Sequence, residues 1–389
     1  MRKVSFIHHL RGLAALLVVF AHFYGVFWTA PGAVAYLLHS PQYTLDGNLP
    51  FLTSILQKLS PFNLGAFGVA IFFLISGFVI SISIKKYNTL NFLLARVVRI
   101  YPTYLVGFAI SSLVLFFYSV WYDLFADFSV ARLVPQFLLI RDWLWLPSLD
   151  GISWTLEIEL KFYILCALLS VFFKRNMPRV LAIIICTVSI LWAVCWNNNF
   201  FALQAHRYLL AVSYSFPFIV YMFIGVIFFF IYSHELTLKT GFVIIALLFI
   251  NFLVLCATTS FFEAGYKTYV VNYGIALVIF SLLYLTLNNK VITSPVTYIL
   301  GNISYSLYVI HPIVGYAAMH LMLQLGVSYE FIAFFVTLIS IFSAYLLHRF
   351  VELPSHKMAQ RLSKVKLSVH MIKEVLLPLQ RKVTAFIHS

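Results

Sequence analysis

The chain alternates long apolar runs with short polar connections. Ten of these runs are about 20 residues long or longer, which is the length that an α-helix needs to cross the hydrocarbon core of a bilayer. The pattern therefore predicts an all-α, polytopic membrane protein with about ten transmembrane helices. The predicted spans cover residues 6–28, 64–84, 98–120, 154–173, 179–197, 207–232, 241–260, 268–287, 297–323 and 328–350.

The composition agrees with this prediction and narrows the functions that remain. Of the 389 residues, 62% are hydrophobic and 10% are charged, which is more apolar surface than a soluble core can hide. The four cysteines all lie within apolar runs and have neither the spacing of a metal site nor a disulfide framework. We therefore expect no metal, no permanently bound cofactor and no nucleic-acid partner.

The net charge of +14 is unevenly distributed between the connections. Every second connection is the more basic one, whereas the connection at 121–153 is mixed to acidic. Basic connections face the cytoplasm, so both termini are predicted to be cytoplasmic. The first apolar run is too long for a signal peptide and is expected to remain as an anchor.

Two parts follow from this organisation. Residues 1–354 form the predicted membrane domain, and residues 355–389 form a basic cytoplasmic tail. Because the tail mixes Lys and Arg with apolar residues, it fits an amphipathic helix on the inner leaflet, broken at Pro378. A disordered basic end fits equally well.

The first span carries two ionisable residues on one face. Arg11 and His22 are eleven residues apart, and at about 100° per residue they return to nearly the same helix face, roughly 16 Å apart along the axis. Ionisable side chains inside a membrane span are costly and indicate function. The alternative is that Arg11 reaches the interface while His22 hydrogen-bonds a neighbouring helix.

Further polar residues mark other spans. Arg96 and Arg99 share a helix face at the cytoplasmic side, where they can hold a phosphate or anchor the helix among lipid headgroups. Ser76, followed by Gly77, interrupts bulky residues, which is typical of close helix packing and also compatible with a nearby ligand.

The fourth and ninth spans hold the remaining candidates. Glu157 and Glu159 enter apolar sequence two residues apart, so they point to different faces and at most one faces His22. Tyr308 and His311 are three residues apart and share a face, and a second intramembrane His needs a partner.

Together these stretches resemble the integral-membrane acyltransferase family three, which includes bacterial O-antigen and exopolysaccharide O-acetylases. The chain departs from the family pattern at His8, where an acidic residue is common, and at Leu353, where Lys is common. The segments that carry the resemblance, in chain order, are LRGLAALLVVFAH at 10–22, FFLISGF at 72–78, RVVRIYPTY at 96–104, SWTLEIELKFY at 153–163, ISYSLYVIH at 303–311 and VELP at 351–354.

The resemblance implies a membrane O-acyltransferase of the bacterial inner membrane. The donor would be cytoplasmic acyl-CoA, most simply acetyl-CoA, and the acceptor a carbohydrate or glycolipid, with lipids around the spans. The family pattern implies three groups of residues in this chain: His22, Glu159 and His311 in catalysis; Arg11, Arg96 and Arg99 on the donor phosphates; and Ser76, Trp154 and Tyr308 at the substrate.

A transporter or flippase for a lipid-linked or small polar substrate is the alternative function. It would also place polar residues within spans. Transporters often consist of two matching halves, and this sequence contains no internal repeat. The sequence leaves open whether the acyl group passes through a covalent intermediate or is transferred directly.

Overall fold

The computed structural model describes residues 5–45, 49–124, 127–197, 203–258, 266–288 and 290–362. Within these ranges the chain contains helices and no strand, which confirms the predicted all-α class. The predicted tail falls largely outside the described residues. The elements in chain order are α1 (Ser5–Ala21), the π-helix η1 (His22–Val26), α2 (Phe27–Thr29), α3 (Pro31–Leu38), α4 (Phe51–Lys58), α5 (Leu64–Lys86), α6 (Thr89–Trp121), α7 (Val130–Phe137), the 3-10 helix η2 (Arg141–Leu144), α8 (Ser153–Leu168), α9 (Ser170–Lys174), α10 (Pro178–Asn197), α11 (Leu203–Tyr232), α12 (Leu238–Thr258), α13 (Tyr266–Leu287), α14 (Pro295–Gln324), α15 (Tyr329–Leu347), the π-helix η4 (His348–Glu352) and α16 (Leu353–Leu362).

Nine helices in the described part of the chain are long and apolar enough to cross a membrane. They match nine of the ten predicted runs, and the first and last of them each continue through a π-helix. The tenth predicted run, 154–173, forms α8 and α9, which are separated at Leu169. The chain is therefore a multi-pass membrane protein in which one predicted span is shorter than the others.

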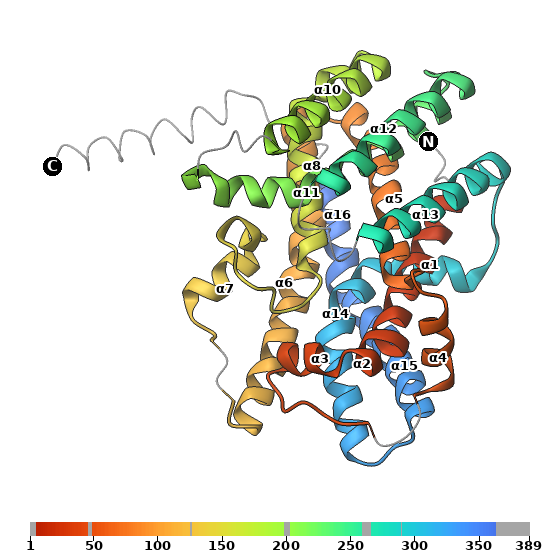
Figure 1. The fold of residues 1–389 in the computed structure, drawn as a ribbon. Coiled ribbons are helices and arrows are strands. Elements are labelled where there is room, and N and C mark those ends of the chain that lie inside the picture. Colours follow the sequence, from red (N-terminus) through yellow and green to blue (C-terminus); the bar gives the residue numbers. More distant parts are fainter. Residues whose placement is uncertain are drawn as a thin grey trace.

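Two central helices organise the bundle. Helix α14 packs against α1, α15 and α6, and α5 packs against α1, α11 and α13. The short helices α2, α3 and α4 gather at the lower end in Figure 1, which the charge pattern predicts to be the outer side. Helix α1 thus lies between α14 and α5, where both faces of its apolar sequence are covered.

The contact between α1 and α14 requires glycine. A Cβ atom added at Gly301 would lie 2.4 Å from the carbonyl oxygen of His8, so the two helix backbones touch. Small residues permit this kind of approach between membrane helices. The consequence is that polar side chains of α1 and η1 lie directly against α14.

The connection between α6 and α8 turns back into the bundle, and we call residues 127–152 the return segment. Its contacts on α6 shift from near the end of that helix, at residue 128, toward the first half of the helix, at residues 136–138. Figure 1 accordingly shows α7 level with the middle of α6 rather than beyond its end. The contacts are ring pairs Phe128–Phe116 at 6.0 Å and Phe137–Phe108 at 4.8 Å, and hydrogen bonds from Tyr104 to the Gln136 carbonyl at 2.9 Å and from Tyr101 to the Leu138 carbonyl at 2.8 Å.

These contacts explain why α8 is short. Helix α8 has 16 residues, or about 24 Å at 1.5 Å per residue, which is less than the roughly 30 Å of hydrocarbon. It starts inside the bundle because the return segment has already carried the chain inward. Irregular backbone at membrane depth needs protein partners for its polar groups, and the Tyr101 and Tyr104 hydroxyls supply two of them.

This arrangement predicts different reagent access at two exposed positions of the connection. In a protein whose native cysteines are replaced, Ser129→Cys should react with an impermeant thiol reagent added outside spheroplasts, because Ser129 precedes α7 on the outer side. Leu138→Cys, although Leu138 is 47% exposed, should resist that reagent because lipid surrounds it.

Asn176→Cys, in the basic connection after α9, is the internal control and should react only after permeabilisation. Equal labelling of positions 129 and 138 would contradict the return segment. Labelling of position 176 with protection of 129 would reverse the topology.

Candidate active site

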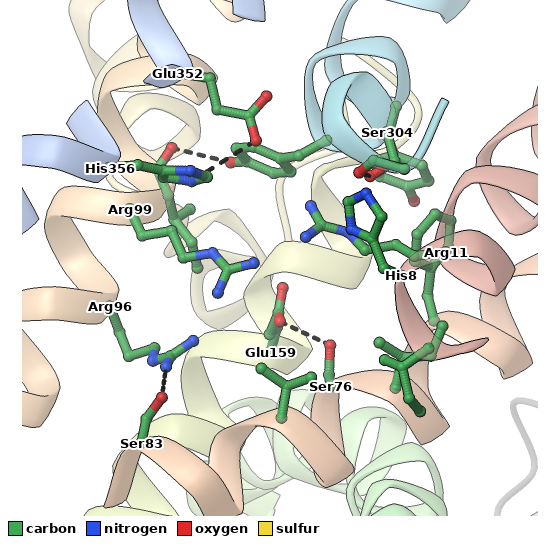
Figure 2. Close-up of a pocket in the computed structure, with 18 of the residues that line it drawn as sticks. His8, Arg11, Ser76, Ser83, Arg96, Arg99, Glu159, Ser304, Glu352 and His356 are labelled. Atoms are coloured by element: carbon green, nitrogen blue, oxygen red, sulfur yellow. Dashed lines mark hydrogen bonds and ion pairs between the residues drawn. The ribbon is translucent and has the colours of Figure 1, made fainter. Parts of the chain in front are cut away.

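A cavity of about 670 Å³ lies between α1, α5, α6, α8, α14 and the end of the last span. Figure 2 shows Arg96 and Arg99 projecting from α6, Arg11 from α1, and Glu159 between them. Four cationic side chains line the cavity against two carboxylates: Arg11, Arg96, Arg99 and Lys357 against Glu159 and Glu352. The cavity is therefore suited to an anion.

The three arginines differ in how well they are paired. Arg96 donates to the Ser83 hydroxyl and lies over the rings of Phe92 and Tyr163, at 5.7 and 5.6 Å. In contrast, no residue that the structure describes forms a hydrogen bond or ion pair with the guanidinium of Arg11 or Arg99. Two unpaired guanidinium groups inside an apolar bundle are costly, and a bound anionic group would satisfy both.

The two glutamates of α8 diverge as their spacing predicts. Glu157 points away from the cavity and forms a two-pronged ion pair with Arg141, at 2.9 and 2.5 Å, which fixes the return segment to α8. Glu159 faces the cavity, where its Oε1 accepts hydrogen bonds from the Ser76 hydroxyl at 2.9 Å and from Tyr163. Its contacts thus lie with the arginines, and no contact with His22 is among them.

Ser76 lies where α5 meets both α8 and α11. A Cβ atom added at the adjacent Gly77 would lie 1.9 Å from the Met222 carbonyl oxygen of α11. Gly77 therefore serves close helix packing, while the Ser76 side chain points into the cavity toward Glu159 (Figure 2). The sequence allowed either close helix packing or a nearby ligand for these two residues. Gly77 fits the first interpretation and Ser76 fits the second.

The aromatic candidates occupy different environments. Tyr308 lines the cavity, and its hydroxyl is 2.7 Å from the Thr155 hydroxyl of α8. Trp154 lies outside the lining and packs against Phe218 and Tyr214 of α11, with ring centroids 5.7 and 6.3 Å apart. In this conformation Tyr308 is in position to contact a ligand in the cavity, whereas Trp154 supports the start of α8.

His22 and His311 are hydrogen-bonded to each other. Nδ1 of His22 is 3.0 Å from Nε2 of His311, so residues 289 positions apart form one imidazole pair. Neither histidine lines the cavity directly, but the ring of Tyr308, which does, is 6.0 Å from the ring of His311. The pair therefore lies beyond the inner end of the cavity, next to Tyr308.

Sequence reasoning missed a cluster at the mouth of the cavity. The Glu352 carboxylate, 1% exposed, accepts from the Ser306 hydroxyl at 2.7 Å and lies 3.0 Å from Nδ1 of His348. His356 lies one turn further on, with Nε2 3.7 Å from Oε1 of Glu352. The sequence does contain a signal for this cluster. His348, Glu352 and His356 follow one another at intervals of four residues, which places all three on one helix face. His8 also lines the cavity.

Residues 4–349 match the protein family described as an acyltransferase domain, acyltransferase family three. The chain belongs to this family.

One curated relative supports the same class. Acyltransferase MdmB of Streptomyces mycarofaciens is 31% identical over 153 residues, an alignment that covers 36% of this acyltransferase and 36% of the relative. The aligned part is thus about a third of each protein. No solved structure matches the chain.

The unpaired arginines generate a prediction about ligand binding. If the anion held in the cavity is CoA, replacing Arg99 by Gln in the purified membrane acyltransferase should weaken CoA binding by about tenfold or more, because hydrogen bonds to charged groups contribute about 1.5–3 kcal/mol. Replacement by Lys should recover binding in part, since Lys keeps the charge but lacks the planar fork. Calorimetric titration in detergent or nanodiscs measures both.

Arg175→Gln is the matched control, because Arg175 is exposed in the basic connection after α9 and does not line the cavity. Unchanged affinity in Arg99→Gln, or an equal loss in Arg175→Gln, would make Arg99 a topology anchor.

Proposed function

We propose that this membrane acyltransferase moves an acyl group, acetyl in the simplest case, from cytoplasmic acyl-CoA to a hydroxyl of a cell-surface or exported carbohydrate. The observation that carries the proposal is the cavity with unpaired Arg11 and Arg99 toward its mouth and Tyr308, beside the imidazole pair, at its inner end. The bacterial inner membrane is the proposed location, because acyl-CoA is supplied from the cytoplasm.

The donor fits the distribution of charge in the cavity. The phosphates of CoA would lie among Arg11, Arg96 and Arg99, since guanidinium groups bind phosphate through forked hydrogen bonds. The thioester end carries no charge and would extend past Ser76 toward Tyr308. No permanently bound cofactor is needed, because acyl-CoA is itself consumed as a substrate.

The imidazole of His22 supplies the base for transfer. It removes the proton of the acceptor hydroxyl, and the oxygen forms a bond to the thioester carbonyl carbon as the carbon–sulfur bond breaks. The CoA thiolate leaves toward the cytoplasmic side and takes up the proton, from the imidazolium or through water. An imidazole suits this role because it both accepts and returns a proton near neutral pH.

The acceptor class is tested on whole cells. Mass analysis of surface glycans from cells with and without the gene should show a lost acyl increment, 42 mass units lighter per lost group if acetyl is transferred (about the mass of C2H2O). Reintroducing the gene should restore the increment, while a copy carrying His22→Gln should not. Unchanged glycan masses would refute a carbohydrate acceptor.

Replacement of His22 tests the reaction directly. His22→Gln should lower acyl transfer by about a hundredfold to ten-thousandfold, which is the usual contribution of a positioned general base. The amide of Gln keeps hydrogen-bonding capacity but has no basicity. Release of CoA thiol, measured with acceptor in vesicles containing matched amounts of protein, reports the rate.

His9→Gln is the matched control on the same helix. Nδ1 of His9 is 2.6 Å from the Thr297 hydroxyl, a contact that Gln can replace, and His9 does not line the cavity. It should keep most of the activity. Substantial turnover by His22→Gln would exclude His22 as the base.

A further inference from the structure

A proline inside α14 creates an acceptor for the side chain of His311. In an α-helix the backbone N–H of residue 312 would bond to the carbonyl of residue 308, but Pro312 has no N–H. The carbonyl oxygen of Tyr308 is instead 2.9 Å from Nδ1 of His311, and that of Leu307 is 3.0 Å from the same atom. The imidazole thus occupies the place that the missing N–H leaves.

These contacts determine where the hydrogen of His311 lies. A carbonyl oxygen can only accept, so Nδ1 of His311 must carry the hydrogen. Its Nε2 then holds a lone pair when the ring is neutral. A neutral ring is expected because no carboxylate among the described residues contacts either histidine, and an uncompensated imidazolium inside the bilayer would be costly.

The same reasoning extends to His22. Nε2 of His311, as an acceptor, faces Nδ1 of His22 at 3.0 Å, so Nδ1 of His22 must carry its hydrogen. Nε2 of His22 then carries the lone pair. No described residue forms a hydrogen bond with it, and the side chain of His22 is partly exposed.

The His22 ring also has a contact outside this chain of hydrogen bonds. Tyr316 stacks against it with centroids 5.8 Å apart and planes at 27°. Helix η1, which begins at His22, has carbonyls that accept from side chains, as in the 2.7 Å bonds from Trp28 Nε1 to Phe23 and from Thr53 to Tyr24. Widened turns of this kind are frequent at functional sites.

We propose that His311 is a positioning residue that holds His22 in its Nδ1–H form, so that Nε2 of His22 is the atom that removes the acceptor proton. The inference rests on the proposed acyl transfer for its catalytic part, whereas its structural part concerns only the two rings. When Nε2 of His22 gains the proton of the acceptor hydroxyl, Nδ1–H donates to the lone pair of His311 and shares the positive charge with it. Nδ1 of His311 keeps its hydrogen throughout and donates it to the Tyr308 carbonyl.

A pair of variants at position 311 tests the catalytic part. Gln can accept from His22 and donate to the Tyr308 carbonyl, whereas Leu can do neither. Loss of a group that orients a reactive imidazole typically costs about tenfold to a hundredfold, so His311→Leu should lower kcat by that factor with an unchanged KM for acyl-CoA. His311→Gln should recover most of kcat. Equal activity of His311→Leu and the unmodified enzyme overturns the proposal, as does a loss confined to KM.

Pro312→Ala tests the origin of the arrangement without removing either histidine. The backbone N–H that this substitution introduces at position 312 would compete with Nδ1 of His311 for the Tyr308 carbonyl. We therefore expect kcat to fall several-fold, even though the helix gains a hydrogen bond. Pro217→Ala, in the interior of α11 and outside the cavity lining, is the matched control and should leave kcat unchanged. Equal effects of the two substitutions would contradict the role of Pro312.

Nitrogen-15 NMR of histidine-labelled protein in lipid vesicles tests the structural part without any assay of activity. The His22 signals, assigned by their absence in His22→Gln, should report a protonated Nδ1 and an unprotonated Nε2. His311→Leu should shift them toward the other form. An unprotonated Nδ1 in the unmodified protein overturns the proposal. If the predicted form is found but the enzyme does not consume acyl-CoA, the failure lies with the proposed donor and not with the pairing.

Discussion

A polar group inside a bilayer must find its hydrogen-bond partner within the protein, and this constraint accounts for most of the structure. The hydroxyls of Tyr101 and Tyr104 satisfy carbonyls of the return segment, and Arg141 neutralises Glu157. In contrast, the guanidinium groups of Arg11 and Arg99 form no hydrogen bond or ion pair with the residues described. Both guanidinium groups face one cavity, which makes a bound anionic ligand the most direct explanation for their cost.

Irregular backbone coincides with the candidate chemistry. His22 begins the π-helix η1, Glu352 ends the π-helix η4, and His311 precedes Pro312 in α14. Each irregularity leaves carbonyls without their usual helical partners. In α14 such a carbonyl bonds a ring of the site itself, since Nδ1 of His311 is 2.9 Å from the Tyr308 carbonyl. The irregular turns and the candidate functional residues therefore lie together.

The sequence predicted the helices well because hydrocarbon thickness sets a simple length requirement. It failed on the length of α8, because periodicity does not reveal that residues 127–152 turn back along α6. It singled out Arg11 and His22, since an ionisable residue within an apolar run is visible in one dimension, but it left Arg99 as either a phosphate ligand or an anchor among lipid headgroups. It could not show that Glu159 faces arginines or that Nδ1 of His22 meets His311, because those pairings arise from contacts between helices distant in sequence.

The positions of charge and base suggest how a highly charged donor can react with an acceptor on the other side of a membrane. Moving phosphate groups through hydrocarbon would be prohibitively costly. If Arg11, Arg96 and Arg99 hold the phosphates at their own depth, only the uncharged arm and its acyl group need to extend further inward, past Ser76 to Tyr308. The thioester carbon would then meet a neutral imidazole pair rather than a carboxylate. Neither the base nor the uncharged arm of the donor would place a net charge in the middle of the bundle. In the proposed reaction, the anion site lies in the cavity and the base beyond its inner end, so the acyl group would cross while its carrier remains on the cytoplasmic side.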